Sequence, residues 1–326
     1  MRTSTLTLVL VLGFVLTAAP AVYGMTEMYV SSGGDVLRYD AETGTPLPAP
    51  SQSGAIFATG LTAAHGLEIG PDYNGDGKAD LYVVEKYGDQ QLDIFSGIDG
   101  TLLVKFGNGW SSPRGVAIGP DLNAYVNIRN DNKVVKVALP AGTESDFASA
   151  GLNNGSDCEW IGGRLWAVGE NDDCWVYDAA GNLVTTVKTA SGVTTFGEIS
   201  VTGGPDGMVY FGGRNDTFVK VFDPVNNTYT GVLSTADGLG ISYDDVRGIS
   251  FGPDLNGDGV QDLYIGASGA TYGTVYAVDI QDKVVTGTFA GNPDTEMWVY
   301  IAPVPEPATM SLLVLGGVAM LKRRRA

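Results

Sequence analysis

The sequence predicts an all-β protein with the architecture of a six-bladed β-propeller. The first observation is the composition, because glycine is frequent, with 46 residues among 326, and only 17% of residues are charged. The second is a series of short apolar segments of strand length, separated by turn residues. The third is an internal repeat of about 40–50 residues with four short strands per unit, which is typical of propeller blades.

The repeat is clearest where each unit begins, near residues 66, 115, 158, 198 and 248. Three units share a Gly-Pro-Asp turn after their first strand: GLEIGPDYNGDGKADLYVVE, GVAIGPDLNAYVNIR and GISFGPDLNGDGVQDLYIGA. The unit ISVTGGPDGMVYFGGR has one extra glycine, and CEWIGGRLWAVGE keeps the rhythm without Pro-Asp. A third strand follows in each unit, at residues 91–95, 133–139, 174–178, 218–223 and 273–279.

The two ends of the repeat region are expected to form one shared blade. The N-terminal piece TEMYVSSGGDVLRYDAETGTPL supplies outer strands without an inner strand ahead of them, and residues 295–303, TEMWVYIAP, supply a lone strand. Combining them closes the ring and gives six blades, or seven if one long unit splits. A β-sandwich would explain the alternating strands but not the recurring Gly-Pro-Asp, and a parallel solenoid would need shorter repeats.

The first 24 residues, MRTSTLTLVLVLGFVLTAAPAVYG, have the features of a secretory signal peptide. One arginine precedes an apolar run, and small residues follow it. A membrane anchor is the alternative, but the run is short for a spanning helix. The sequence therefore predicts export of a propeller domain that covers residues 25–303.

Residues 304–326, VPEPATMSLLVLGGVAMLKRRRA, place a Pro-Glu-Pro triplet before an apolar run and a cationic end. This order resembles the PEP-CTERM sorting signal of bacterial exported proteins. The resemblance implies handling by an exosortase-type enzyme and delivery to the cell surface or an extracellular matrix. It also implies membrane anchoring by an apolar transmembrane segment, transient or retained; a plain tail anchor is the alternative.

Two further resemblances concern the blades. The unit SPRGVAIGPDLNAYVNIRNDNKVVKVAL resembles an NHL-type blade, and the two units with Asn-Gly-Asp-Gly resemble FG-GAP blades, the integrin-type propeller repeat. These resemblances imply the propeller fold and, for the second type, a calcium loop.

Two acidic loops place oxygen-bearing side chains at relative positions 1, 3, 5 and 9, and position 7 needs only its backbone carbonyl. Such a set of hard oxygen ligands suits Ca²⁺. An EF-hand is excluded, because position 12 is Val83 or Ile265 inside a strand. Other blades close the same hairpin with shorter turns, so we expect a structural calcium in each loop; an acidic Asn-Gly turn is the alternative. The expected ligands are Asp72, Asn74, Asp76, Lys78 and Asp80 in the first loop, and Asp254, Asn256, Asp258, Val260 and Asp262 in the second.

Cys158 and Cys174 are the only cysteines. Because export leads to an oxidising compartment, pairing is the default expectation. The intervening sequence reads as strand, turn, strand, turn, strand, so the disulfide would tie one strand to the next but one. A zinc site is poorly supported, with one histidine and no Cys-x-x-Cys motif.

An active site would be expected at one mouth of the central channel. The repeat places His65, Arg114 and Arg247 at one equivalent position, just before the glycine that opens the inner strand. Lactonase-like propeller enzymes build a metal site at this mouth from acidic and amide residues. The alternative is a purely structural role, in which these side chains pair with acidic neighbours or cap loop carbonyls. Further candidates are Glu68, Asn154, Asp157, Glu159 and Glu198.

These observations favour a calcium-stabilised propeller that acts as a binding or structural module for a polysaccharide or a surface protein. A secreted hydrolase or lyase with a site at the channel mouth is the second hypothesis. The net charge of −18 argues against nucleic acid as a partner. Ice binding has no support, because the flat threonine-rich repeat it needs is absent.

Overall fold

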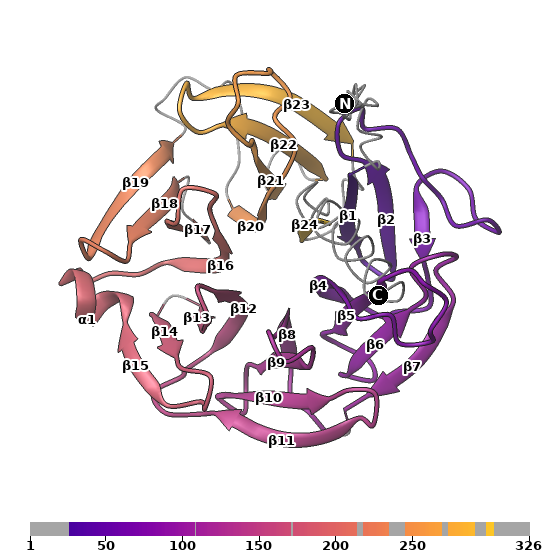
Figure 1. Cartoon of the computed structure of the whole chain (residues 1–326), viewed down its shortest axis with the longest axis horizontal. Coiled ribbons are helices and arrows are strands. Elements are labelled where there is room, and N and C mark those ends of the chain that lie inside the picture. The colour runs from indigo at the N-terminus through magenta and orange to yellow at the C-terminus, as the bar shows by residue number, and fades with distance from the viewer. Residues whose placement is uncertain are drawn as a thin grey trace, which may run out of the picture. The chain divides into compact units, whose positions relative to one another are not determined.

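The computed structural model of the chain describes residues 26–107, 109–170, 172–213, 218–234, 245–268, 273–290 and 298–302. These residues belong to a compact unit, Met25–Pro303, and form six four-stranded antiparallel sheets. The sheets are arranged as blades around a central axis (Figure 1). The predicted six-bladed β-propeller is therefore confirmed.

The blades share one order of strands from the axis outward. The innermost strands are β24 (Val299–Ile301), β4 (Ala64–Gly70), β8 (Pro113–Ile118), β12 (Gly155–Ile161), β16 (Glu198–Gly203) and β20 (Asp245–Phe251). The second strands are β1 (Glu27–Ser32), β5 (Asp80–Glu85), β9 (Ala124–Ile128), β13 (Arg164–Gly169), β17 (Val209–Gly213) and β21 (Leu263–Ser268). The third strands are β2 (Asp35–Asp40), β6 (Leu92–Phe95), β10 (Lys133–Ala138), β14 (Cys174–Tyr177), β18 (Phe218–Asp223) and β22 (Thr274–Asp279). The outermost strands are β3 (Ile56–Ala58), β7 (Leu102–Phe106), β11 (Thr143–Ala148), β15 (Leu183–Thr186), β19 (Thr228–Ser234) and β23 (Val284–Ala290), and the short helix α1 (Val187–Ser191) follows β15.

The ring is closed by strands from both ends of the repeat region. β24 pairs antiparallel with β1, with Tyr300 opposite Tyr29 and Val299 opposite Val30. One sheet thus contains the first three strands and the last strand of the chain, in the order β24-β1-β2-β3. This is the shared blade that the sequence predicts.

An aromatic residue recurs at the same place on the second strand of every blade. Each of these aromatic residues lies opposite a residue one or two positions before the end of the innermost strand, so the pairing defines one level around the axis. The pairs are Tyr29 with Tyr300, Tyr82 with Glu68, Tyr125 with Ala117, Trp166 with Glu159, Tyr210 with Thr202, and Tyr264 with Ser250. The six partner residues on the innermost strands, which are far apart in the sequence, therefore occupy equivalent positions near the axis.

Glycine allows the innermost strands to approach one another closely. A Cβ at Gly66 would lie 2.5 Å from the carbonyl oxygen of Arg114, and a Cβ at Gly115 would lie 2.6 Å from the Cα of Asp157. Both distances are shorter than a van der Waals contact, so a side chain at either position would force two blades apart. Close packing of the innermost strands thus explains why glycine follows His65 and Arg114 in the repeat.

The hydrophobic core lies between the blades, because the clusters of buried side chains combine residues of neighbouring sheets. One cluster joins Tyr82 and Ile94 to Val126 and Val135 of the next blade. Both faces of a central strand are therefore apolar, and all six residues of β5 are buried. This explains why DLYVV and DLYIG read as continuous apolar runs.

The predicted disulfide between Cys158 and Cys174 is wrong, and both cysteines are buried free thiols. They lie on β12 and β14, which flank β13, so two strand spacings of about 4.8 Å separate them, more than a disulfide spans. Cys158 pairs with Ala167 and Cys174 with Val168. Because successive residues of β13 face opposite sides, the two thiols point to opposite faces of the sheet and pack in different clusters.

Two predictions fall outside the described part of the chain, namely the signal peptide of residues 1–24 and the sorting tail of residues 304–326. Within the described part, the structure has no helix of the length and apolarity that crossing a membrane requires.

Candidate functional site

The two acidic loops are hairpins between the first and second strands of the β4 and β20 blades. The aspartate at position 1 accepts the same backbone hydrogen bonds in both loops. Asp72 accepts hydrogen bonds from the backbone N–H groups of Gly75 (2.6 Å) and Gly77 (2.7 Å). Asp254 accepts the equivalent bonds from Gly257 (2.7 Å) and Gly259 (2.7 Å).

The glycines of both loops adopt the left-handed conformation that other residues avoid. Gly75 and Gly77 have φ values of 77° and 92°, and Gly257 and Gly259 have 77° and 93°. Two loops in different blades therefore share one backbone path, which their Asn-Gly-Asp-Gly sequence permits.

The seventh position of the first loop contributes no side chain. The Nζ of Lys78 lies 3.0 Å from a carboxylate oxygen of Glu27, on a different blade, so the lysine side chain leaves the loop. This agrees with the expectation that position 7 offers only its carbonyl.

The ninth position of each loop is a buried aspartate. Asp80 accepts hydrogen bonds from the N–H groups of Tyr73 (2.7 Å) and Gly97 (2.9 Å). Asp262 accepts hydrogen bonds through Oδ2 from the N–H of Leu255 (3.0 Å) and the hydroxyl of Thr286 (2.7 Å). Its Oδ1 is buried and has no hydrogen-bond partner in the described part of the chain. Burial raises the pKa of both carboxyls. An unpartnered buried carboxylate oxygen beside further carboxylate and amide oxygens fits a hard cation such as Ca²⁺.

The second loop also meets carboxylates that the sequence did not indicate. Oxygens of Asp258, Asp279 and Asp282 lie within 4.8 Å of one another, and Asp279 accepts a hydrogen bond from Asn256 Nδ2 (2.9 Å). Asp279 is the last residue of β22 and Asp282 lies in the turn that follows, so the sheet register was needed to find them. Ser96 occupies the place of Asp279 in the β4 blade, so the two loops differ here.

The predicted rim residues are brought together, in a buried environment. His65 is 2% exposed, and its Nδ1 lies 3.1 Å from the carbonyl oxygen of Arg114. Its ring packs against Trp298 in a tilted arrangement, with 4.3 Å between the ring centres and 41° between the ring planes. Burial, followed by the charges of Arg114, Lys86 and Arg247, lowers the pKa of His65 well below its usual range. His65 is therefore a neutral ring that caps a carbonyl, which agrees with the structural role given as the alternative to an active site.

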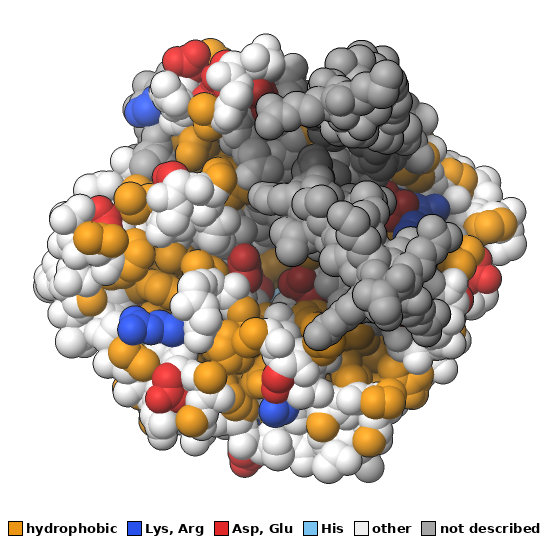
Figure 2. Space-filling view, viewed as in Figure 1, with side chains coloured by type: hydrophobic (Ala, Val, Ile, Leu, Met, Phe, Trp, Pro, Cys, Tyr) orange, Lys and Arg blue, Asp and Glu red, His pale blue; other side chains and the backbone are white. Residues whose placement is uncertain are grey.

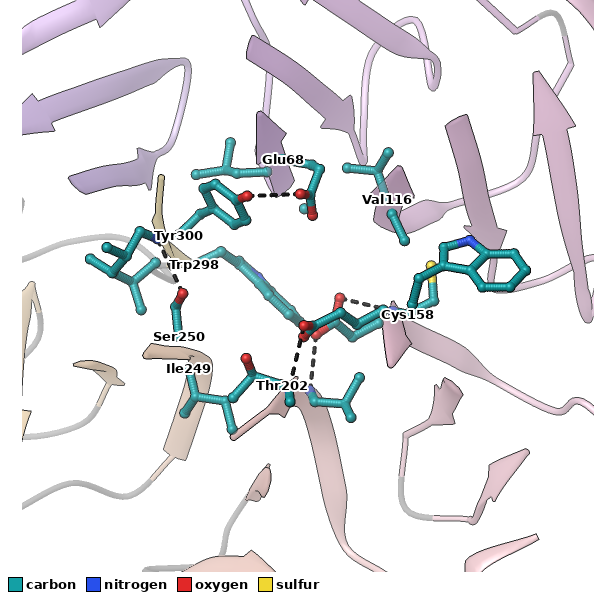
Figure 3. Close-up of a pocket in the computed structure, with 18 of the residues that line it drawn as sticks. Glu68, Val116, Cys158, Thr202, Ile249, Ser250, Trp298 and Tyr300 are labelled. Atoms are coloured by element: carbon teal, nitrogen blue, oxygen red, sulfur yellow. Dashed lines mark hydrogen bonds between the residues drawn. The ribbon is translucent and has the colours of Figure 1, made fainter. Parts of the chain in front are cut away.

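A cavity of about 260 Å³ lies on the axis of the propeller and is lined by the innermost strands of all six blades (Figure 3). Acidic side chains are visible inside the central hollow of the molecule (Figure 2). Three carboxylates line this cavity, namely Glu68 from β4 and Asp157 and Glu159 from β12.

These three carboxylates are held by neighbouring blades. Glu68 accepts a hydrogen bond from the hydroxyl of Tyr300 (2.8 Å), and the pair is visible in Figure 3. Asp157 accepts one from the backbone N–H of Val201 (3.1 Å), and Glu159 accepts one from Gly203 (3.3 Å). The side chains of β12 thus bind the inner edge of β16, where the sheet has no further strand.

Among the residues that the structure describes, no Lys or Arg side chain pairs with Asp157 or Glu159. Burial is the main cause that raises the pKa of Asp157 to about 7 and that of Glu159 to about 8, and neither Lys nor Arg contributes to either shift. Burial, with repulsion from the other two, also raises the pKa of Glu68 well above its usual value. In contrast, a buried acid elsewhere, Glu198, lies 2.6 Å from the Nζ of Lys220.

The five further candidates from the sequence therefore divide into two groups. Glu68, Asp157 and Glu159 share the channel, whereas Glu198 forms an ion pair and Asn154 is exposed and donates its N–H to Asn132. The sequence reasoning missed Trp298 and Tyr300, which line the same cavity. The repeat could have found Tyr300, because it occupies the level of Glu68 once β24 is recognised as an innermost strand.

Comparison with known families and structures agrees with the fold. Residues 246–278 match the FG-GAP repeat, and residues 303–325 match the PEP-CTERM protein-sorting motif. No curated protein matches the sequence. The chain is thus a β-propeller that carries the sorting motif of exported proteins, a motif that implies processing by an exosortase-type enzyme.

Solved structures with the same architecture are distant in sequence. A chain of the nidogen/laminin complex has a TM-score of 0.64 and 12% identity, over 86% of this chain and 100% of that chain. A protein of unknown function from Bacteroides caccae has a TM-score of 0.63 and 12% identity, over 87% and 100%. Virginiamycin B lyase from Staphylococcus aureus has a TM-score of 0.51 and 13% identity, over 84% and 78%. At these identities the likeness shows the fold alone.

Proposed function

We propose that this chain is a calcium-stabilised propeller that acts as a binding module at the cell surface or in the extracellular matrix. The observation that carries the proposal is the pair of acidic loops with one backbone path and one set of hydrogen bonds. The sorting motif supports the location. The partner is a matrix polysaccharide or a surface protein, and the C-terminal tail anchors the chain in the membrane before or instead of its release.

The residues of each loop would hold the ion through the carboxylates at positions 1, 5 and 9, the amide at position 3 and the carbonyl at position 7. A bound Ca²⁺ supplies electrostatic cross-linking of the hairpin and no chemistry. Since extracellular calcium sites often have dissociation constants of about 10⁻⁴–10⁻³ M, the stabilisation should follow extracellular calcium levels.

Calcium titration tests the proposal through the melting temperature. We expect the melting temperature to rise with Ca²⁺ and to fall in a chelator, because the ion binds only the folded loops. Asp72→Asn and Asp254→Asn should each remove one of two binding events in calorimetry, and each should also lower the melting temperature slightly without calcium, because loop hydrogen bonds are weakened.

Asp223→Asn is the matched control for these variants. Asp223 accepts hydrogen bonds from the N–H groups of Val225 (2.7 Å) and Asn226 (3.0 Å) in a turn without an acidic insert. This variant should lose stability and keep the full calcium response. A melting temperature that ignores Ca²⁺ in the unsubstituted protein would contradict the proposal.

A secreted hydrolase or lyase is the second candidate, and one observation favours it. Carboxyls with pKa values of about 7 and 8, such as Asp157 and Glu159, suit general acid or base catalysis near neutral pH. Turnover of lactone substrates would test this candidate, with the Glu159→Gln variant measured beside the unsubstituted protein. Turnover that the variant does not reduce would exclude the channel as its site.

A further inference from the structure

When they are ionised, the channel carboxylates have no cationic partner among the described residues. Glu68, Asp157 and Glu159 line one cavity, and in the described structure their carboxylates bind hydroxyl groups and backbone N–H groups but no Lys or Arg. The remaining residues at the same level are neutral: Ala117, Thr202, Ser250 and Tyr300. A positively charged ligand would supply the missing compensation.

The spacing of these carboxylates argues against a single metal ion. Within the described part of the chain, the one trio of metal-ligating side chains with oxygens inside 4.8 Å is Asp258, Asp279 and Asp282, outside the channel. Glu68 lies on β4 and the other two lie on β12, with β8 between them in the ring. Carboxylates spread in this way suit a cation of larger size.

The cavity also presents an unused hydrogen-bond donor. Trp298 is 4% exposed and lines the cavity, and its buried Nε1 has no hydrogen-bond partner among the residues that the structure describes. Figure 3 shows its side chain extending into the cavity between the blades. An indole N–H donates and never accepts, so the matching group on a ligand is an oxygen. The aromatic ring itself attracts cations.

We propose that the axial cavity binds a small organic ammonium compound that also carries a hydroxyl or carboxylate oxygen. The ammonium group donates hydrogen bonds to Asp157 and Glu159, and the ligand oxygen accepts one from Trp298 Nε1. A volume of about 260 Å³ is sufficient for a ligand with one substituted six-membered ring. The inference concerns the channel alone and stands whether or not the acidic loops hold calcium or the channel is catalytic.

Three matched probes test the chemistry by calorimetry at about pH 9, where Asp157 and Glu159 are mainly ionised. They are trans-4-aminocyclohexanol, cyclohexylamine, which lacks the hydroxyl, and trans-1,4-cyclohexanediol, which lacks the ammonium group. We expect one aminocyclohexanol per chain, with the diol bound at least about tenfold more weakly, because hydrogen bonds between charged groups are the stronger ones. Equal binding of aminocyclohexanol and the diol would overturn the proposal.

Two variants assign the contacts, and a third is the control. Glu159→Gln should weaken aminocyclohexanol binding at least about tenfold. Trp298→Phe should remove the advantage of aminocyclohexanol over cyclohexylamine while the affinity for cyclohexylamine remains. Glu42→Gln, at an exposed turn far from the axis, should bind all three probes as the unsubstituted protein does.

Calcium chloride alone separates an organic ligand from a metal. Calcium that displaces aminocyclohexanol in a manner dependent on Glu159 would assign the channel to a metal ion and overturn the proposal. Calcium that binds elsewhere and leaves aminocyclohexanol affinity unchanged supports it. If Glu159→Gln does not fold, the comparison of the three probes on the unsubstituted protein still decides the outcome.

Discussion

Asp157 and Glu159 show at the scale of single residues how a propeller channel changes the acidity of a side chain. Each carboxyl accepts a hydrogen bond from a backbone N–H group of the neighbouring blade. Val201 donates to Asp157, and Gly203 donates to Glu159. Such bonds favour the ionised form, yet burial outweighs them and raises both pKa values. Nearby Cys158 and Tyr300 are also buried, and the pKa of each is raised, so neither residue is charged near neutral pH.

The raised pKa values predict that stability falls as the pH rises. Below about pH 4 both carboxyls are protonated in the folded and unfolded chains, so they have no net effect. Between there and about pH 8 the folded protein binds more protons than the unfolded chain, so the free energy of unfolding decreases with pH. Melting curves from pH 5 to 9 would show this fall.

The share of the two carboxyls is measured with Asp157→Asn combined with Glu159→Gln. The double variant should have a flatter melting profile over the same range, while Glu42→Gln should keep the original slope. Asp93, with a pKa raised to about 6, contributes to the remaining slope in every variant. A double variant with the full original slope would show that burial does not act on these groups as described.

At the scale of elements, the close approach of innermost strands depends on glycine. Gly66→Ala places a Cβ 2.5 Å from the carbonyl oxygen of Arg114 and 2.8 Å from the Cα of Gly115, both backbone atoms that cannot move away freely. We expect a loss of about 1–3 kcal/mol in the free energy of unfolding, measured by denaturant titration.

Gly197→Ala is the matched control for this substitution, because a Cβ there meets no atom within 4 Å. It should change stability by less than about 0.5 kcal/mol. Similar losses for Gly66→Ala and Gly197→Ala would argue against close strand packing as the cause.

The strand geometry also predicts that the protein keeps two free thiols. Cys158 and Cys174 face opposite sides of their sheet, so oxidising conditions should leave both reduced within one chain. Thiol titration after unfolding without reductant should therefore count two thiols, and reductant should not change the melting temperature. A lower melting temperature in reductant would show a disulfide after all.

At the scale of the whole molecule, ring closure depends on a single short strand. β24 joins β1 in one sheet and contacts β20 and β4 on either side, so it connects the two ends of the ring. Truncation after residue 297 removes this strand, and we expect loss of cooperative melting, because the last blade interfaces open to water. Truncation after residue 302 keeps β24 and should melt as the longer chain does; loss of cooperativity there would contradict this account of closure.

The sequence by itself determined the local features of this protein. The repeat period defined the blades, the Asn-Gly-Asp-Gly segments defined two left-handed turns, and the unpaired end pieces defined the closing blade. These features depend on residues that are close in the chain, where turn chemistry and strand alternation act directly.

Only the tertiary structure decided which distant residues share a site. The register of six sheets brings Glu68, Glu159 and Tyr300 to one level, and it separates Cys158 from Cys174 onto opposite faces. A shift of one residue would reverse each of these outcomes, because successive side chains of a strand face opposite ways. The physical reason is that register follows from long-range packing between blades, which the local sequence pattern does not specify.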